Sequence, residues 1–287
     1  FPLWLYGSDA QRQTFLPKLM SGEWLGGHAI TEPDGGSDVQ AMNCQATAVD
    51  DGFILHGEKR YITNAPLADW LVVYAKLDGK LSAFLLARED VGCRFSAMGA
   101  LAACRGSATG SVQLTHCRIP KDRLLGKVGA GSQMIQKALE YERAFIFAGI
   151  AGIMAWQLDE VVRHSRQRHS GGVHLGKHQA ISHRIADMKL RLDTVELWLN
   201  ECARLCDSGQ RLTLVSAQTK LYAAEAFLQS CLDAVHILGA SGLESHSLMA
   251  EWVQDALAGR LFSGSSEVQK NLIAALLGTG DAYRGTG

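Results

Sequence analysis

Several common signatures are missing from this 287-residue sequence. No stretch of about 18 or more purely apolar residues occurs, so we expect no membrane-spanning helix and no membrane partner. The 28 basic and 29 acidic residues leave a net charge of -1, which gives no reason to expect nucleic acid as a partner. The GxGxxG and Walker patterns are also absent, which argues against an ordinary dinucleotide-binding or P-loop fold.

Cysteine patterns for metal or disulfide chemistry are missing as well. The seven cysteines form no CxxC pair. Cys202 and Cys206 lie four residues apart on a predicted helix, but no histidine or second cysteine pair accompanies them as a zinc site requires. No secretory signal is visible, although the sequence begins with Phe1 rather than Met. We therefore expect no metal site, reduced thiols and a cytoplasmic protein.

The sequence does contain the composition of an ordinary globular protein, 47% hydrophobic and 20% charged, long enough for two domains unless it is a fragment of something larger. Residues 8–23 predict a short amphipathic helix that Ser8 or Asp9 can cap. Residues 24–126 alternate in short strands and turns, with a hairpin signature at Asp78 and Gly79. This part predicts one all-β domain of antiparallel strands.

The remaining residues, 127–287, are predicted to be helical. Apolar residues recur at spacings of three and four over 133–168, 181–199, 213–238 and 251–277, the last stretch interrupted at 263–265. Four long helices joined by short loops predict an antiparallel bundle. The predicted fold class is therefore α+β, with a β domain followed by a helical bundle.

The first predicted helix carries two carboxylates that cannot share a face. Glu140 and Glu142 are two positions apart, which places them about 200° apart around the helix axis. Polar neighbours such as Gln136 assign Glu140 to the solvent side, and apolar neighbours such as Phe145 assign Glu142 to the buried side. A buried carboxylate is costly unless it is paired or used. From the pattern alone, Glu142 is either a hydrogen-bonded structural residue or a catalytic one.

Two loop motifs accompany the predicted strands. Residues 31–38, Thr-Glu-Pro-Asp-Gly-Gly-Ser-Asp, form a Gly-rich loop whose backbone N–H groups can bind an anion or the edge of an electron-rich ring. Residues 61–64, Tyr-Ile-Thr-Asn, end a strand with a hydroxyl and an amide. Either motif also suits a simple tight turn, so neither identifies a ligand by itself.

Seven motifs in one order are far more specific than any of them alone. They are residues 29–38, 57–64, 105–110, 117–120, 129–131, 142–143 and 262–269. From about Ser8 onward the sequence resembles the flavin-dependent acyl-CoA dehydrogenase family. The resemblance implies an N-terminal helical domain, a middle antiparallel β domain and a C-terminal four-helix bundle. Residues 1–23 would end the first domain, which is largely missing, 24–126 would form the second and 127–287 the third.

The resemblance also implies FAD as cofactor, held between the β domain and the bundle, with a neighbouring subunit of a homodimer or homotetramer completing the site. Ile30, Thr31 and the Gly36-Ser37 turn would face the flavin, and Tyr61 to Thr63 would cover its other side. Arg168 matches an arginine that meets the pyrophosphate across the dimer interface, a role suited to a fixed cation. The cofactor-binding positions implied in this way are Ile30, Thr31, Gly36, Ser37, Tyr61, Ile62, Thr63, Arg168, Gln179, His236, Gly239, Ser265 and Glu267.

Some of these positions depart from the family pattern. Tyr61 stands where the family often has Trp, and Gly171 stands where it has an aromatic residue before glycine. His236 and the Gly239-Ala240 pair replace a glutamine and a Gly-Gly pair. Each change removes a stacking or hydrogen-bonding group, so we expect FAD to be held more loosely than in most relatives.

The catalytic carboxylate is the most important departure. Most relatives carry it immediately before the glycine that matches Gly264, where this chain has Ser263, whose hydroxyl is no base unaided. A minority, including isovaleryl-CoA dehydrogenases, carry it one residue before an arginine on the first bundle helix, the position of Glu142. The resemblance therefore implies that Glu142 removes the α-proton of the substrate while the β-hydrogen passes as hydride to flavin N5. The Ser263 backbone N–H and a flavin ribityl hydroxyl would bind the thioester carbonyl.

Within the family, the motifs look most like prolyl-carrier-protein dehydrogenases of nonribosomal peptide biosynthesis. These act on an aminoacyl thioester tethered to a peptidyl or acyl carrier protein, which the basic run at Arg163, Arg166, Arg168 and His169 would suit. The alternative substrate is the acyl thioester of a short branched-chain acyl-CoA dehydrogenase. A different class also stays open, a flavin-binding or scaffold relative without activity, which Ser263 favours and Glu142 opposes.

Overall fold

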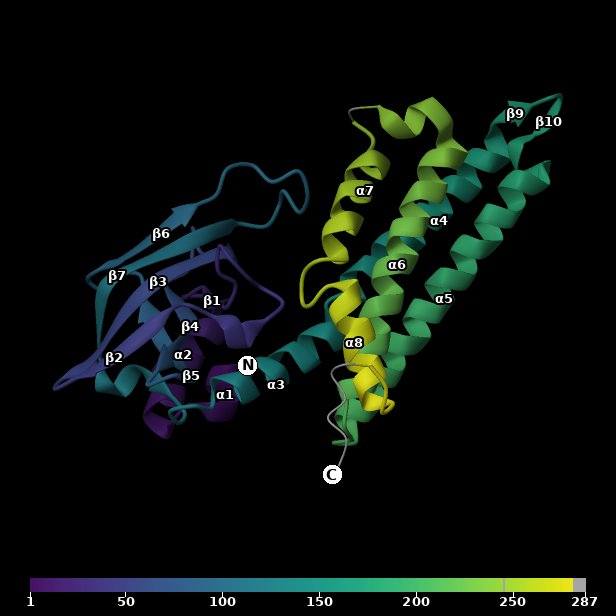
Figure 1. Ribbon diagram of the computed structural model, residues 1–287. Coiled ribbons are helices and arrows are strands. Elements are labelled where there is room, and N and C mark those ends of the chain that lie inside the picture. The colour runs from purple at the N-terminus through teal and green to yellow at the C-terminus, as the bar shows by residue number, and fades with distance from the viewer. Residues whose placement is uncertain (245, 281–287) are drawn as a thin grey trace. The chain divides into compact units, whose positions relative to one another are not determined.

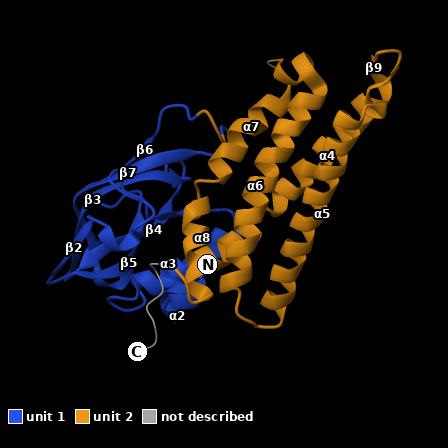
Figure 2. Ribbon diagram, turned by 45° about the vertical axis from the view of Figure 1, so that its right-hand side comes forward, with its two compact units in different colours: residues 1–101, 105–138 blue, residues 102–104, 139–287 orange. Residues whose placement is uncertain are grey.

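The computed structural model describes residues 1–244 and 246–280, which divide into two compact units (Figure 2). Unit 1 contains residues 1–101 and 105–138, and unit 2 contains residues 102–104 and the chain from 139 onward. The division at 138/139 falls within helix α3 (Gly131–Phe145). The domain boundaries predicted at 23/24 and 126/127 stay predictions.

Unit 1 begins with two short helices, α1 (Pro2–Tyr6) and α2 (Asp9–Ser21). The Ser8 hydroxyl accepts a hydrogen bond from the Gln11 backbone N–H, and the Gln11 side chain accepts one from the Ser8 N–H. This capping box satisfies two backbone donors that a helix start leaves open. Phe15 is 7% exposed and its ring meets that of Trp70 edge-on at 4.6 Å. The helix predicted over 8–23 is thereby confirmed, with Ser8 as its cap.

The rest of unit 1 is an eight-stranded sheet (Figure 1). Its strand order is β6-β7-β3-β2-β4-β5-β8, and β1 pairs with β4. The neighbours are antiparallel except β1 and β2, which each run parallel to β4. The strands are β1 (Gly26–Ala29), β2 (Gln45–Val49), β3 (Gly52–Thr63), β4 (Trp70–Leu77), β5 (Lys80–Ala87), β6 (Cys93–Ala97), β7 (Thr109–Pro120) and β8 (Leu124–Leu125). Short 3-10 turns η1 (Val39–Ala41) and η2 (Lys121–Arg123) complete the unit.

The predicted hairpin is the β4–β5 pair. Asp78 and Gly79 connect the strands with φ angles of 49° and 73°, the positive values that a tight hairpin turn requires at both central positions. Tyr74 and Phe84, from the two strands, have no exposed surface. The hairpin therefore lies in the core of unit 1.

Unit 2 is a helical bundle (Figure 1). It contains the end of α3, then α4 (Ala148–Gln167), α5 (Gln179–Asp207), α6 (Thr213–Leu238), α7 (Leu248–Gly259) and α8 (Ser266–Leu276). A small hairpin, β9 (His169–Ser170) with β10 (Val173–His174), follows α4, and short turns η3 (Leu175–Lys177) and η4 (Gly239–Leu243) precede α5 and follow α6. The core packs Phe147, Met154, Val195 and Phe227 together. The helices predicted over 213–238 and, with an interruption, 251–277 are confirmed.

The single helix predicted over 133–168 is wrong. The chain leaves the helical path after Phe145 and resumes at Ala148, giving α3 and α4. Phe147 lies in the break, has no exposed surface, and stacks on Phe262 with ring centroids 6.0 Å apart. The tertiary contact between these rings accompanies a two-residue interruption, Ile146 and Phe147, in a stretch that the local sequence predicts as helix.

Two helical stretches among the described residues, 131–167 and 213–243, are long and apolar enough to cross a membrane by length and composition. In the apolar 18-residue window of each stretch, 33% of the first and 44% of the second are buried inside the protein. Their buried residues, among them Met154 and Phe227, form the core of unit 2. Core helices of globular proteins pass the same test, so this finding adds no argument for a membrane.

Candidate active site

Glu142 near the end of α3 meets Ser263 in the loop between α7 and α8, although 121 positions separate them. The Ser263 hydroxyl donates a hydrogen bond to the Glu142 carboxylate. The Ser263 carbonyl accepts one from Arg143 Nε at 3.1 Å and one from Gln269 Nε2 at 3.2 Å. The structure therefore brings together Glu142, which is the predicted base, and Ser263, which stands where the resemblance places the carboxylate of most relatives.

The loop that carries Ser263 is fixed in an unusual conformation. Ser263 and Gly264 have φ angles of 54° and 86°. A Cβ on Gly264 would lie 2.6 Å from Gln269 Nε2, which donates to the Gly264 carbonyl at 2.9 Å. The Ser265 hydroxyl caps α8 by accepting from the Val268 N–H at 3.4 Å. Glycine is thus required at 264 by both backbone angle and space.

The Ser263 backbone N–H remains available. Among the residues that the structure describes, no group accepts a hydrogen bond from it. Its neighbours Phe262 and Ser266 donate to Ala258 and Arg260 carbonyls. A backbone N–H without an acceptor inside the protein can donate to the carbonyl oxygen of a ligand.

The predicted burial of the two carboxylates on α3 is the wrong way round. Glu140 is 7% exposed and accepts a hydrogen bond from the Thr213 hydroxyl at 2.5 Å, whereas Glu142 is exposed. The prediction relied on an apolar stripe continuing through Phe145, but α3 ends there. Glu140 is covered because Ala144, one turn further along, is fully buried where α6 begins.

Sequence reasoning also missed a buried amine behind this loop. Lys220 of α6 has no exposed surface, and no described residue accepts a hydrogen bond from its Nζ. That Nζ lies 5.9 Å from the centroid of the Phe262 ring. Burial, and then the positive charge of Arg143, lower the pKa of Lys220 to about 8. A lysine among apolar residues of a helix gives no sign in the sequence that its ammonium lacks a partner.

In unit 1, the two segments predicted to face a flavin lie side by side. The Arg60 N–H donates to the Thr31 carbonyl at 2.9 Å. A bulge in the β3–β7 pairing follows, and Tyr61 adopts a φ of 58° and is 53% exposed. Thr63 is exposed too, but Ile62 is 2% exposed and points into the core, as strand alternation requires. Only the backbone of Ile62 is available to a ligand.

The Gly-rich loop at 31–38 is short and tight. Glu32 and Gly35 exchange backbone hydrogen bonds of 2.9 and 3.2 Å, and Gly36 and Ser37 are exposed. A pocket of about 100 Å³ beside the loop is lined by Ile30, Glu32, Gly35, Gly36, Asp38 and Met42. Pockets for cofactors usually measure about 300–1,000 Å³. This pocket alone is therefore too small to enclose a flavin, and the exposed residues around it form an open platform.

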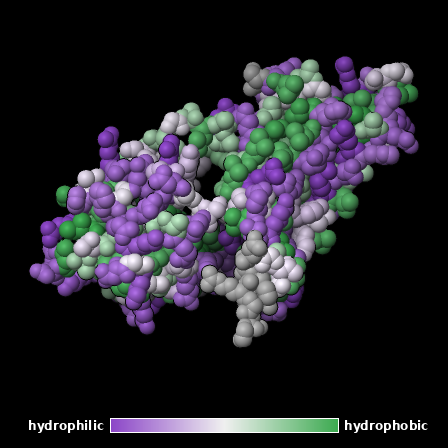
Figure 3. All heavy atoms as spheres, in the orientation of Figure 1, coloured by the Kyte–Doolittle hydropathy of each residue, from purple (hydrophilic) through white to green (hydrophobic). Residues whose placement is uncertain are grey.

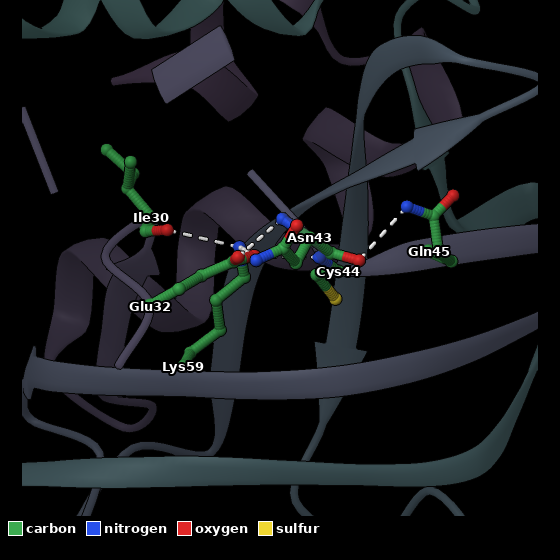
Figure 4. A network of polar contacts seen from close by, with 6 residues as sticks. All are labelled: Ile30, Glu32, Asn43, Cys44, Gln45 and Lys59. Carbon is green, nitrogen blue, oxygen red and sulfur yellow. Dashed lines mark hydrogen bonds and ion pairs between the residues drawn. The ribbon is translucent and has the colours of Figure 1, made fainter. Parts of the chain in front are cut away.

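Below this loop lies a buried ion pair that sequence reasoning did not identify (Figure 4). Lys59 Nζ lies 2.8 Å from Glu32 Oε1, and the two side chains are 0% and 7% exposed. The Glu32 carboxylate also accepts from the backbone N–H groups of Asn43 and Cys44. Burial opposes the ionisation of Glu32, but the hydrogen bond from Lys59 and the two amides hold its pKa below the usual range.

The other predicted cofactor residues of unit 2 fall into two separate groups. Ser265 and Glu267 lie at the start of α8, where the Ser266 hydroxyl bonds to Glu225 of α6 at 2.7 Å. His236 is eleven positions further along α6, roughly 16 Å away at a rise of about 1.5 Å per residue. Arg168, Gln179 and Gly239 lie near that far end, at the ends of α4, α5 and α6. Within one chain the structure does not bring the two groups together.

Two further features of unit 2 bear on ligands and partners. One is a pocket of about 370 Å³ between α5, α6 and α8, which contains no predicted site residue. It is lined by Trp198, Gln218, Leu221, Tyr222, Glu225, Lys270 and Ile273. Figure 3 shows hydrophobic side chains gathered on the surface over α7, where Leu248 and Leu257 are 47% and 49% exposed, and Leu261 in the loop after α7 is 71% exposed. No group of three or more metal-binding side chains occurs within the described parts of the chain.

Two family models match the sequence. Residues 27–117 match the middle domain of acyl-CoA dehydrogenases, and residues 129–278 match their C-terminal domain. The N-terminal residues before 27 lie outside both matches.

Curated relatives cover nearly the whole chain. The L-prolyl peptidyl-carrier-protein dehydrogenase of Pseudomonas fluorescens is 37% identical over 280 residues, which cover 95% of this chain and 73% of that protein. The mitochondrial isovaleryl-CoA dehydrogenase of Arabidopsis thaliana is 36% identical over 272 residues, covering 93% of this chain and 66% of that protein. The chain thus spans 66–73% of the length of these two relatives.

Solved structures agree closely with the fold. The prolyl acyl carrier protein oxidase AnaB superposes with a TM-score of 0.94 at 32% identity, covering 96% of this chain and 75% of that chain. PigA, solved with FAD and proline, also gives 0.94 at 30% identity, covering 96% and 74%. The predicted α+β architecture is confirmed over both units.

Proposed function

Because the chain belongs to the acyl-CoA dehydrogenase family, whose members are FAD-dependent oxidoreductases acting on acyl thioesters, we propose that it dehydrogenates the α,β carbon–carbon bond of an acyl or aminoacyl thioester. The observation that carries this proposal is the contact between the Glu142 carboxylate and the Ser263 hydroxyl. Through this contact the Glu142 carboxylate reaches the α7–α8 loop. The family resemblance places the carboxylate of most relatives in that loop, at the position that Ser263 occupies here.

The residues of unit 1 fit a flavin. Tyr61 is 53% exposed, and its aromatic ring offers a face for stacking. The half-buried Thr31 and the exposed Thr63 supply hydroxyl groups on the adjoining backbone, and Gly36 leaves the loop open beside them. FAD bound there would supply the acceptor for the hydride that leaves the substrate β-carbon.

The groups of unit 2 would then perform the proton chemistry. Glu142 would remove the α-proton of the thioester, and the open Ser263 N–H would donate to its carbonyl oxygen. Arg143 and Gln269 hold the Ser263 carbonyl and so fix the direction of that N–H. The Ser263 hydroxyl orients the carboxylate toward the same loop.

The remaining cofactor contacts favour an assembly of identical subunits. Arg168, Gln179, His236 and Gly239 lie at the end of the bundle away from Ser265 and Glu267. We place them on the cofactor of a neighbouring copy, in a homodimer or homotetramer. The exposed leucines over α7 supply apolar surface of the kind that such contacts bury.

For the substrate we favour a prolyl or related aminoacyl group on a carrier protein, because the prolyl-carrier-protein dehydrogenase and AnaB are among the similar proteins. A short branched-chain acyl-CoA is the second candidate, which the comparable identity to isovaleryl-CoA dehydrogenase supports. The basic run offers less charge than its sequence indicates, since Arg163 pairs with Glu160. Arg166 remains exposed for an acidic carrier protein, whereas Arg168 is assigned above to the cofactor of a neighbouring copy.

The test is the anaerobic loss of visible flavin absorbance after mixing with prolyl-carrier protein or isovaleryl-CoA. We expect Glu142→Gln to keep the flavin and slow its reduction by about 100-fold or more, the scale of a lost general base. Glu140→Gln is the matched control, because that carboxylate faces Thr213, and it should keep most of the rate.

Three results would contradict parts of the proposal. Full activity in Glu142→Gln would remove Glu142 as the base. Reduction by isovaleryl-CoA but not by prolyl-carrier protein would select the second substrate. A wild-type protein that binds FAD, yet is reduced by neither thioester nor by other acyl-CoA and aminoacyl-carrier substrates, would favour the scaffold without activity.

A further inference from the structure

The buried pair formed by Glu32 and Lys59 joins the two segments that face the proposed flavin site (Figure 4). Lys59 is two residues before Tyr61 on β3, and its Nζ donates to the Ile30 carbonyl at 3.1 Å and to Glu32 Oε1 at 2.8 Å. Ile30 and Glu32 flank Thr31 on the Gly-rich loop. A single ammonium therefore links both neighbours of Thr31 to the strand that carries Tyr61.

Glu32 extends the same connection toward β2. Its Oε2 accepts from the Asn43 N–H at 2.5 Å, and its Oε1 accepts from the Cys44 N–H at 2.9 Å. Three backbone groups that lie outside regular pairing are satisfied by these two side chains. The carboxylate thus ties the loop at 30–38 to the entrance of the next strand.

Stability alone does not explain a pair of this kind. Replacing a buried ion pair by apolar residues of similar size is often neutral or stabilising, because two charges no longer have to leave water. What apolar residues cannot replace is the directional bonding to the Ile30 carbonyl and to the Asn43 and Cys44 amides. The pair therefore fixes the positions of these backbone groups rather than raising the free energy of unfolding.

Resting on the function proposed above, we propose that Glu32 and Lys59 are positioning residues, which hold Thr31 and Tyr61 at the spacing that FAD binding requires. The Arg60 N–H bond to the Thr31 carbonyl, 2.9 Å long, joins the same two segments at the surface. The ion pair and this backbone bond together fix the positions of Thr31 and Tyr61 without the cofactor. Affinity gained by such pre-organisation is lost when the platform relaxes.

The experiment measures FAD affinity of the apoprotein, by flavin fluorescence, for Lys59→Met, Glu32→Gln and the double variant. Glu58→Gln and Lys80→Met are matched controls on β3 and β5, because neither side chain has a described partner. In parallel, iodoacetamide labelling of the folded apoprotein is followed by mass spectrometry at Cys44 and Cys117. These thiols are 1% and 0% exposed, and only Cys44 lies next to the pair.

We expect each single variant to weaken FAD binding at least about tenfold. Labelling of Cys44 should accelerate while that of Cys117 does not change, since the loop loosens and the sheet stays folded. The double variant should recover thermal stability, because no unpaired charge remains, without recovering FAD affinity. Both controls should bind FAD as the wild type does.

Equal FAD affinity in the folded variants would overturn the inference and leave the proposed function intact. Parallel acceleration at Cys44 and Cys117 would also overturn it, because the pair would then act on global stability. A wild-type apoprotein that binds no FAD would overturn the proposed function together with this role. If Lys59→Met fails to fold, Glu32→Gln carries the same comparison.

Discussion

Replacing Lys220 by methionine is expected to stabilise the protein at neutral pH, against the usual cost of a core substitution. Lys220 has no exposed surface, and its Nζ has no hydrogen-bond partner among the described residues. Methionine has nearly the same length and no charge, so it keeps the packing against Phe262 and removes the unpaired ammonium.

The magnitude follows from the pKa of the lysine. Burial lowers it from 10.5 to about 8, and each pKa unit corresponds to about 1.4 kcal/mol, so the buried ammonium costs at most about 3 kcal/mol. Below about pH 8 both folded and unfolded chains carry the proton and the cost is complete. Between about 8 and 10.5 the unfolded chain binds more protons, so wild-type stability rises with pH and the advantage of methionine shrinks. We expect about 3 kcal/mol at pH 7 and about 1.5 kcal/mol at pH 9.5.

The assay is urea unfolding followed by helical circular dichroism, on wild type, Lys220→Met and the exposed-site control Lys177→Met, at both pH values. The difference between variants is needed, because burial raises the pKa of the Cys202 and Cys231 thiols and makes them act in the opposite direction. A Lys220→Met protein that is less stable than wild type at pH 7 would refute the reasoning. A stability advantage of Lys220→Met that does not decrease from pH 7 to pH 9.5 would refute it too.

Three other predictions concern the bundle and its loop. Asp233, whose side chain is 4% exposed, pairs with Arg184 and Arg191, so Asp233→Asn should lower the free energy of unfolding by about 2–4 kcal/mol in urea titration. Gly264→Ala should slow flavin reduction and destabilise the protein by about 1–2 kcal/mol, because its φ is 86° and its Cβ would lie 2.6 Å from Gln269 Nε2. Unchanged kinetics in that variant would mean that the loop tolerates another conformation. Ser263→Glu combined with Glu142→Gln should reduce flavin faster than Glu142→Gln alone, measured by anaerobic stopped flow.

Local sequence patterns predicted the elements that are determined by residues within the same segment. The β4–β5 hairpin follows from Asp78-Gly79 between two apolar runs, and α6 follows from a regular apolar period with a clear end. The break between α3 and α4 could not be predicted, because it depends on Phe147 reaching Phe262, 115 positions later in the chain. The burial of Glu140 was missed for the same reason, since Thr213 covers it from another helix.

In the candidate site, too, features determined by local sequence were predicted and those that depend on distant contacts were not. Motif order identified the family and selected Glu142 and Ser263, but not the residues that hold them in place. Lys59 and Glu32 lie 27 positions apart, and nothing in either local sequence indicates that the two charges are buried together. The catalytic and cofactor roles, the domain boundaries, the oligomeric state and the cytoplasmic location stay predictions.

With Glu142 as the proposed base, its contact with Ser263 would explain how a family can keep one reaction while its carboxylate occupies either of two places in the sequence. A base must reach the substrate carbon, and it does not matter which element carries it, provided that the carboxylate arrives at the same point. Here α3 and the α7–α8 loop touch through these two side chains, with Arg143 fastening the loop to the same helix. The Ser263 N–H belongs to the backbone, so it survives when the side chain changes from glutamate to serine. Under the proposed function, the oxyanion donor would therefore stay with the loop, whereas the base would be carried by the helix that the loop contacts.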